Sequence, residues 1–521
     1  MEIKIKSKYL IFPVNKEAAV KQLKFLKEGK EVYGLNVRLD NIQPDFFAYV
    51  DVERFMGDTL ELTIDAGMPI RFTEADEMKF EDEYQESLRP QIHFTTKNGW
   101  NNDPNGLVYM DGVYHMFYQY NPCSPIWNNM HWGHAVSTDL LHWKETDIAL
   151  FSEPSGTIFS GSAIEDKENL LGLNTDEQNA MLLYYTLTDE PRPQCLAYST
   201  DGGHRFIKYE GNPILSHVEA YNRDPKVVRC EELGRYLMAL YLNDNRYGFY
   251  TSKNLVDWKP LQQVALPGDD ECPDIFPLTD DDGNRFWVLM GASDKYLIGV
   301  FENGRFVPVQ SQHSLHYGKI NYAAQSFSGV PNGRAIRIAW NRIRVDGGRF
   351  SQQMGFPTEM SLEKNSGEYF LRSRLIPEIE KLIETTDVYS DLELADTPVS
   401  LDVTTAPLLI RIKAKYDTPF SLEVFGGKLD VNPAMNELTV QTSTALKVPP
   451  SVAPLSITEK EIDLTLLIDR CSMEIFADDG KICLTERFVC DFNLPYVAIA
   501  GEGRIQNIEI NTLKSIWREK Q

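Results

Sequence analysis

The chain has 521 residues, of which 42% are hydrophobic and 25% charged, so it has ample material for a folded core. Its 76 acidic residues against 52 basic ones give a net charge of −24. This balance argues against nucleic-acid and anionic membrane partners and favours an uncharged or cationic one. Since no run of 18 apolar residues occurs, the sequence predicts no transmembrane helix.

The first residues, MEIKIKSKYLIFPV, contain only a five-residue apolar stretch, too short for the core of a signal peptide. We expect a cytoplasmic protein if Met1 is the native start, and a secreted or periplasmic one if a signal peptide has been removed. Seven cysteines, an odd number without a CxxC pair, argue against a disulfide framework or a zinc ribbon. No phosphate-cradling glycine loop or dinucleotide fingerprint is present, so we expect no cofactor and no metal site.

Residues 1–75 contain strand-like pieces and predict an accessory N-terminal β-domain. Residues 74–86 then carry seven carboxylates in thirteen positions, a pattern typical of a solvated acidic connector, placed at 76–90. The N-terminal region either shapes or extends a binding site of the next domain, or only buttresses that domain.

Residues 91–370 are rich in short alternating stretches bounded by turn residues, which predict strands. The clearest are 108–118, 181–186, 235–242, 285–290 and 335–340. Three segments share a strand, a Ser, a polar turn and an aromatic: HAVSTDLLHW (134–143), LAYSTDGGHRF (196–206) and GFYTSKNLVDW (248–258). Their serines are 62 and 53 residues apart, about the length of a four-stranded propeller blade. Three unrelated hairpins with Ser-Asx turns are the alternative.

Residues 371–384, LRSRLIPEIEKLIE, have apolar positions at helical spacing and predict a linker helix. The remaining residues, 385–521, contain several alternating stretches and predict a C-terminal β-sandwich. The fold class is therefore all-β.

Three motifs place an acid beside a rigid turn residue: Asp103 in WNNDPNG (100–106), Asp224 in NRDPKVV (222–228) and Glu271 in ECPDIFPL (271–278). Pro104 and the following Asn-Gly predict that Asp103 lies on a short, stiff loop. Any one Asp-Pro pair is more simply a turn. Together the motifs matter because cleavage of a glycosidic bond needs two carboxyls at short range in opposite protonation states. In a propeller, the starts of the innermost strands converge at the axial channel, where such acids can meet.

The chain from about residue 93 to 362 resembles glycoside hydrolase family 32, the invertase, inulinase and levanase group. The resemblance rests on WNNDPNGLVYMDGVYHMFYQYNP followed in order by MHWGHAVSTDLLHW, FSGSA (159–163), RDP (223–225), ECPD (271–274) and YAAQSF (322–327). The segment DRCSMEIFADDG resembles the C-terminal sandwich of the family. Asn101 and GFPTEMSLEK (355–364) depart from the family pattern. The resemblance implies a five-bladed β-propeller catalytic domain followed by the sandwich.

The resemblance also implies that Asp103 is the nucleophile, Glu271 the general acid and base, and Asp224 a transition-state stabiliser. Backbone and Asn donors favour an ionised Asp103, and Arg223 favours the charged form of Asp224. A retaining mechanism would place the carboxyls of Asp103 and Glu271 about 5–5.5 Å apart.

Eight further positions match the sugar pocket of the family and are expected to contact substrate: Asn102, Gln119, Trp127, Phe159, Ser160, Arg223, Tyr322 and Trp340. Amides, hydroxyls and a guanidinium can bind sugar hydroxyls, and aromatic faces can cover the C–H surface of the ring. Cys272 is expected to be a small packing group beside Glu271. His131 and His134 are expected to be neutral and structural, because their spacing points them to opposite faces of a strand.

The leading hypothesis is a retaining glycosidase that cleaves terminal β-fructofuranosyl linkages in sucrose, fructo-oligosaccharides or fructans such as inulin and levan. The alternatives are a fructosyltransferase or difructose-dianhydride-forming enzyme, an arabinan- or xylan-cleaving enzyme of the same fold, and a non-catalytic fructan-binding protein. The partner expected is a neutral carbohydrate. Linkage preference, endo or exo action and oligomeric state do not follow from the sequence.

Overall fold

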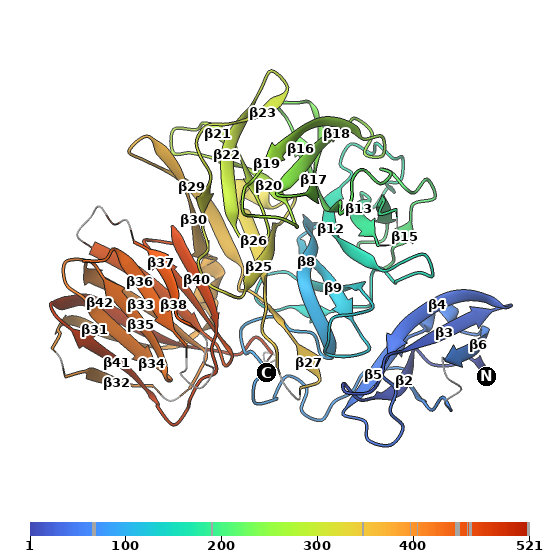
Figure 1. The fold of residues 1–521 in the computed structure, drawn as a ribbon, viewed down its shortest axis with the longest axis horizontal. Helices are drawn as coiled ribbons and strands as arrows, with labels where there is room; N and C mark the ends of the chain where they lie inside the picture. The colour runs from blue at the N-terminus through green and yellow to red at the C-terminus, as the bar shows by residue number, and fades with distance from the viewer. Residues whose placement is uncertain are drawn as a thin grey trace.

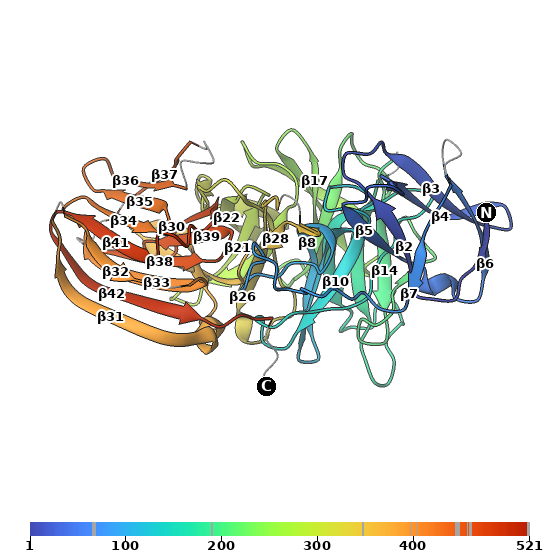
Figure 2. The ribbon, with the colours of Figure 1, turned by 90° about the horizontal axis from the view of Figure 1, so that it is seen from below.

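The computed structural model describes residues 1–64, 69–188, 191–345, 348–395, 397–403, 405–442, 449–455, 457 and 461–517. Nearly all its regular structure is β-strand, which confirms the all-β prediction. A β-propeller lies in the middle, with a C-terminal β-sandwich at one end of the long axis and an N-terminal β-domain at the other (Figures 1 and 2). None of the helices among the described residues is long and apolar enough to cross a membrane.

The N-terminal β-domain consists of two small sheets around one apolar core that includes Phe12, Phe25 and Tyr33. The first sheet has the order β1 (Glu2–Lys4), β6 (Thr59–Ile64), β3 (Lys21–Lys27), β4 (Lys30–Val37). The second has the order β5 (Phe46–Asp51), β2 (Tyr9–Val14), β7 (Thr73–Ala75). The 3-10 turn η1 (Glu53–Phe55) follows β5.

Five antiparallel sheets in the described part of the chain form the blades of the propeller, as predicted. Blade 1 contains β8 (Gly99–Met110), β9 (Val113–Asn121), β10 (His131–Ser137) and β11 (Lys144–Glu145). Blade 2 contains β12 (Ile158–Glu165), β13 (Met181–Leu187), β14 (Gln194–Ser199) and β15 (Ile207–Lys208). Blade 3 contains β16 (Arg223–Cys230), β17 (Arg235–Asn243), β18 (Arg246–Ser252) and β19 (Lys259–Ala265).

Blade 4 contains β20 (Asp274–Thr279), β21 (Arg285–Met290), β22 (Lys295–Glu302) and β23 (Arg305–Pro308), and β24 (His313–Ser314) pairs with β22. Blade 5 contains β25 (Asn321–Ser326), β26 (Ala335–Asn341), β29 (Thr358–Asn365) and β30 (Glu368–Leu375), and β28 (Gln353–Met354) pairs with β26. The 3-10 turn η3 (Pro331–Gly333) precedes β26.

The first strands of the blades contact one another in ring order, and β25 contacts β8 to close the ring. The short strand β27 (Phe350–Ser351) adds to this closure by pairing in parallel with β8. The repeated segments found in the sequence end the third strand of blades 1 to 3. In each, the serine hydroxyl bonds the side chain two residues on: Ser137 with Asp139, Ser199 with Asp201 and Ser252 with Asn254. The repeats are therefore equivalent parts of successive blades.

The prediction of a linker helix at 371–384 is wrong. Residues up to Leu375 belong to β30, a six-residue 3-10 helix η4 (Pro377–Leu382) follows, and β31 (Ile383–Glu393) begins at once. The apolar residues Ile376, Ile379 and Leu382 are buried at a spacing of three, which a 3-10 helix satisfies as well as an α-helix. Pairing of the flanking residues with β29 and β42 (Arg504–Leu513) outweighs the helical pattern.

The C-terminal part of the chain forms the predicted sandwich, with two six-stranded sheets in the described residues. One has the order β31, β42, β33 (Leu408–Lys415), β38 (Glu461–Ile468), β39 (Ser472–Ala477), β40 (Ile482–Arg487). The other has the order β32 (Val399–Asp402), β41 (Tyr496–Gly501), β34 (Phe420–Val424), β35 (Gly427–Asn432), β36 (Glu437–Gln441), β37 (Ser451–Pro454). Their facing side chains form one large apolar core.

A buried histidine joins the sandwich to the start of the propeller. His93 Nδ1 lies 2.9 Å from Asp469 Oδ2, and Nε2 lies 3.4 Å from Glu474 Oε1. Burial lowers the pKa of His93, but the two carboxylates outweigh it and raise the pKa to about 9. The histidine is therefore a buried cation at neutral pH.

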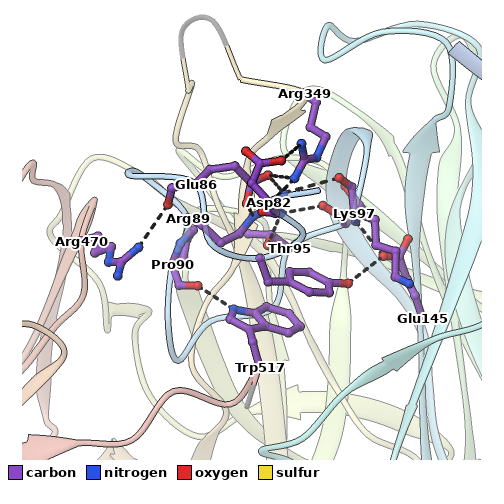
Figure 3. A network of polar contacts seen from close by, with 12 residues as sticks. Asp82, Glu86, Arg89, Pro90, Thr95, Lys97, Glu145, Arg349, Arg470 and Trp517 are labelled. Carbon is purple, nitrogen blue, oxygen red and sulfur yellow. Dashed lines mark hydrogen bonds and ion pairs between the residues drawn. The ribbon is translucent and has the colours of Figure 1, made fainter. Parts of the chain in front are cut away.

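The acidic connector is more than the solvated segment that the sequence predicts. Figure 3 shows it at a meeting point of the propeller, the sandwich and the end of the chain. Arg349 pairs with Asp82 at 2.6 Å and with Glu86 at 2.8 Å, and Arg89, which is fully buried, also pairs with Glu86. Trp517 donates its Nε1–H to Pro90 O at 2.7 Å. Some of the predicted connector charges thus link elements far apart in the sequence.

Candidate active site

Asp103 lies on the innermost strand of blade 1, where that strand is irregular. The register of β8 with β9 shifts between Asn101 and Pro104 and again between Asn105 and Val108. The prediction of a stiff loop is therefore wrong, because two bulges accommodate the turn-forming residues within a continuous strand. Gly106, at the second bulge, has φ 53°. The bulges re-aim the Asp103 side chain into the channel.

Two donors hold the Asp103 carboxyl. Ser160 donates its hydroxyl to Oδ2 at 2.6 Å, and Asn102 Nδ2 donates to Oδ1 at 3.1 Å. Trp100 fixes the Asn102 amide by donating Nε1–H to its oxygen at 2.8 Å. Burial raises the pKa of Asp103, although the Ser160 and Asn102 donors act in the opposite direction. Of the donors predicted from the sequence, the Asn amide is present, whereas no backbone N–H donates to Asp103 among the described residues; burial outweighs the donors that are there.

Asp224 is the second residue of β16, at a bulge between Arg223 and Lys226, and its backbone has φ 64°. Its N–H donates to Thr186 Oγ1 at 3.0 Å. Burial raises the pKa of Asp224 to about 7; the Arg223 guanidinium opposes this, and the charge of Asp103 adds to it. Arg223 therefore favours the charged form, as predicted, but not by enough to offset burial.

Glu271 precedes β20 in a strained segment: Glu271 and Cys272 have φ 55° and 35°, values that non-glycine residues rarely adopt. Its side chain is 34% exposed, pairs with Arg223 Nη2, and accepts the Tyr322 hydroxyl at 2.7 Å. Glu271 is thus more open to solvent than Asp224, whose side chain is 7% exposed. The carboxyls occupy unlike environments.

Cys272 has a larger part in the site than its predicted packing role. Its Sγ lies 3.4 Å from Asp103 Oδ2 and 3.5 Å from Asp224 Oδ2, and its N–H donates to Asp224 Oδ2 at 3.1 Å. Burial and the neighbouring carboxylates raise the pKa of this thiol well above its ordinary value. Cys272 is therefore a neutral donor between two acids, a role that only its position after Glu271 could have suggested.

All eleven predicted site residues line one cavity of about 170 Å³, together with Cys272. They come from every part of the ring: β8 and β9, the segment before β10, β12, β16, the segment before β20, β25 and β26. Trp127 faces Phe159 with ring centroids 6.4 Å apart, and Tyr322 faces Trp340 at 6.2 Å. The cavity thus has aromatic side walls, and the three carboxyl groups also line it.

Gln119, which lines this cavity, has one unpaired acceptor. When the Asn105 amide is oriented with its oxygen towards Gln119, it accepts Nε2–H at 3.1 Å. Gln119 Oε1 is buried and has no hydrogen-bond partner among the described residues. Since buried acceptors are normally satisfied, this unpaired oxygen is an exception at the wall of the cavity.

The two histidines singled out in the sequence lie on β10 outside the cavity. His131 bonds the Tyr33 hydroxyl at 2.8 Å, and His134 bonds His115 at 3.1 Å. Burial lowers the pKa of both, so both are neutral. Among the described residues, one trio of acids is close enough to hold a metal ion, Asp51, Glu53 and Asp147, and Lys8 already pairs with two of them.

The axis of this five-bladed propeller brings together carboxyls in different environments and a polar pocket with aromatic walls. This arrangement is typical of a glycosidase. Family models agree: "Glycosyl hydrolases family 32 N-terminal domain" matches residues 93–373, and "Glycosyl hydrolases family 32 C terminal" matches residues 378–510. The chain belongs to glycosyl hydrolase family 32. The matched residues do not include the N-terminal β-domain.

Individual relatives support the same assignment. A levanase of Bacillus subtilis is 30% identical over 489 residues, covering 83% of this chain and 72% of its own. An invertase of Schizosaccharomyces pombe is 28% identical, covering 83% and 86%. The solved structure of the exo-inulinase from Aspergillus awamori has a TM-score of 0.76 at 22% identity. The match covers 83% of this chain and 100% of the inulinase chain, which shows that the two share a fold.

Proposed function

We propose that this enzyme hydrolyses terminal β-fructofuranosyl linkages in sucrose, fructo-oligosaccharides or fructans by double displacement. The observation that carries the proposal is that all eleven residues expected to act on such a sugar line one cavity. The names of the relatives, levanase and invertase, support a fructosyl substrate.

Asp103 is the proposed nucleophile. Its Oδ2 is aligned by Ser160, and its carboxylate attacks the anomeric carbon of the bound fructosyl unit. Glu271 donates a proton to the departing glycosidic oxygen, so the bond between that oxygen and the anomeric carbon breaks as the ester to Asp103 forms. Glu271 then takes a proton from water, whose oxygen displaces Asp103 and restores the enzyme with net retention.

Arg223 and Tyr322 position the proposed acid–base. The guanidinium pairs with one carboxyl oxygen of Glu271, and the phenol donates to the other. Asp224, deeper in the pocket, is proposed to accept fructose hydroxyls, and these hydrogen bonds would strengthen as positive charge develops on the sugar ring in the transition state.

Product chromatography over time from sucrose, inulin and levan tests the activity. Fructose from the first time point supports terminal hydrolysis, early oligosaccharides would instead indicate endo action, and lengthened or cyclic products would indicate transfer. An Asp103→Asn variant is the matched control and should release no fructose. Methanol as acceptor tests the stereochemistry: methyl β-fructofuranoside supports retention, and the α-anomer would refute double displacement.

The cysteines support action in a reducing compartment. All seven are free thiols, and six are buried. Oxidising compartments favour disulfides, which this chain does not form. Cell fractionation with an activity assay tests this, and activity confined to the medium would contradict it.

A further inference from the structure

The segment between β9 and β10, residues 122–130, forms one wall of the catalytic pocket. Trp127 lines the cavity, faces Phe159, and is 52% exposed. An aromatic side chain this exposed gains little rigidity from packing around itself. Its position therefore depends on what holds the segment.

Both ends of this segment are fixed by the N-terminal β-domain. At the start, Cys123 is 1% exposed and belongs to the apolar core of that domain. At the end, the Asn129 side chain bonds both backbone groups of Asn36 on β4: Oδ1 accepts Asn36 N–H at 2.7 Å, and Nδ2 donates to Asn36 O at 2.8 Å. Asn36 Nδ2 also donates to Asn128 Oδ1 at 3.2 Å. Trp127 lies between these two attachments.

The middle of the segment is half-buried and borders a second cavity. Ser124, Pro125 and Ile126 line a second cavity of about 130 Å³, whose opposite wall includes Arg38 and Phe46 of the N-terminal β-domain. Atoms that border a cavity lack contacts on that side. Within the propeller, Asn121 Nδ2 donates to Ile126 O at 2.7 Å, so the two attachments share the support of the segment with this bond.

We propose that the N-terminal β-domain contributes to substrate binding by this enzyme, because it positions Trp127 through Asn129. This inference rests on the proposed function, in which Trp127 covers the C–H surface of the fructosyl unit. Asn129 is a positioning residue: it does not line the catalytic pocket and acts on the sugar through Trp127. Binding of the substrate, rather than the chemical step, is what this contact sets.

Asn129→Gly is the main variant, because Asn129 has φ 45° and glycine adopts this conformation without strain. The variant loses the two hydrogen bonds to Asn36 and the longer bond from Nδ2 to Asn121 Oδ1 at 3.2 Å. This loss should raise KM for the substrate about five- to tenfold, with kcat changed less than about twofold. Asn129→Asp retains an acceptor for Asn36 N–H and should show a smaller rise in KM. Lys8→Ala is the matched control, since it breaks the ion pair of the N-terminal β-domain with Asp147 without touching the segment.

A double-mutant cycle with Trp127→Ala separates positioning from a general structural effect. If Asn129 acts through Trp127, Asn129→Gly should no longer raise KM in the Trp127→Ala background. An unchanged KM in Asn129→Gly, an equal rise in Lys8→Ala, or a rise that persists without Trp127 would each overturn the inference. Failure of the proposed function would look different: the unmodified enzyme would release no fructose from any substrate.

Discussion

Replacing Asp224 with Asn should stabilise the protein and inactivate it. Burial raises the pKa of Asp224 from 3.8 to about 7, so ionising this carboxyl in the folded chain costs of the order of 4 kcal/mol relative to the unfolded chain. The sign follows from the direction of the shift: the cost is absent below the unfolded pKa, grows as pH rises, and is fully present above about pH 7. Asn is neutral at every pH, and its oxygen can still accept the Cys272 N–H.

The midpoint of thermal unfolding is the quantity to measure, from pH 4 to pH 8. With an unfolding entropy of about 2.1 cal/mol/K per residue, 4 kcal/mol corresponds to about 4 °C for a chain of this length. The variant should melt a few degrees above the unmodified protein at pH 8, and the difference should vanish towards pH 4. A variant that melts at or below the unmodified protein throughout this range would refute the reasoning. Sucrose hydrolysis by the variant should meanwhile fall by at least about a hundredfold.

Asp103→Asn should remove activity while leaving the circular dichroism spectrum unchanged, and retained turnover would contradict the nucleophile assignment. Ser160→Ala removes a donor that lowers the pKa of Asp103, so the acid limb of the pH profile of kcat/KM should move to higher pH; an unmoved limb would show that Asp103 does not control it. His93→Ala leaves two carboxylates without their buried cation and should destabilise the fold by about 3–5 kcal/mol in denaturant titrations. Because its folded pKa is raised to about 9, the contribution of His93 is complete below about pH 6.5 and is lost as pH rises through 9, so the gap between the two proteins should narrow there. Cys272 has a thiol pKa far above neutral and should resist iodoacetamide at pH 7; rapid labelling with loss of activity would contradict that description.

Much of the fold follows from the sequence because strand signals are local. Alternation and turn residues identify β13, β17 and β21 closely, and the serine turns identify equivalent positions in three blades. The failures occur where long-range pairing decides. The pattern at 371–384 is compatible with two kinds of helix, and only the neighbouring strands of blade 5 and the sandwich select a short 3-10 turn.

The site residues could be predicted, but not how the backbone presents them. Asp103 belongs to a motif that reads as a turn, yet the chain continues as a strand with two bulges because β9 and β27 pair with it on both sides. The charge state of the acids could not be predicted from the sequence either. It depends on burial, which Asp224 acquires only when the first strands of the blades close the ring.

The three acids have in common that each lies at an irregular point of the backbone. Asp103 lies at a bulge, Asp224 at a bulge with a left-handed φ, and Glu271 in a pair of left-handed residues. A regular strand would alternate these side chains between the two faces of its blade. Irregular backbone turns them towards the axis instead, where Asp103 and Asp224 lose solvent. Strain and charge burial thus occur together at Asp224, which is why removing the charge there is expected to raise stability and abolish activity together.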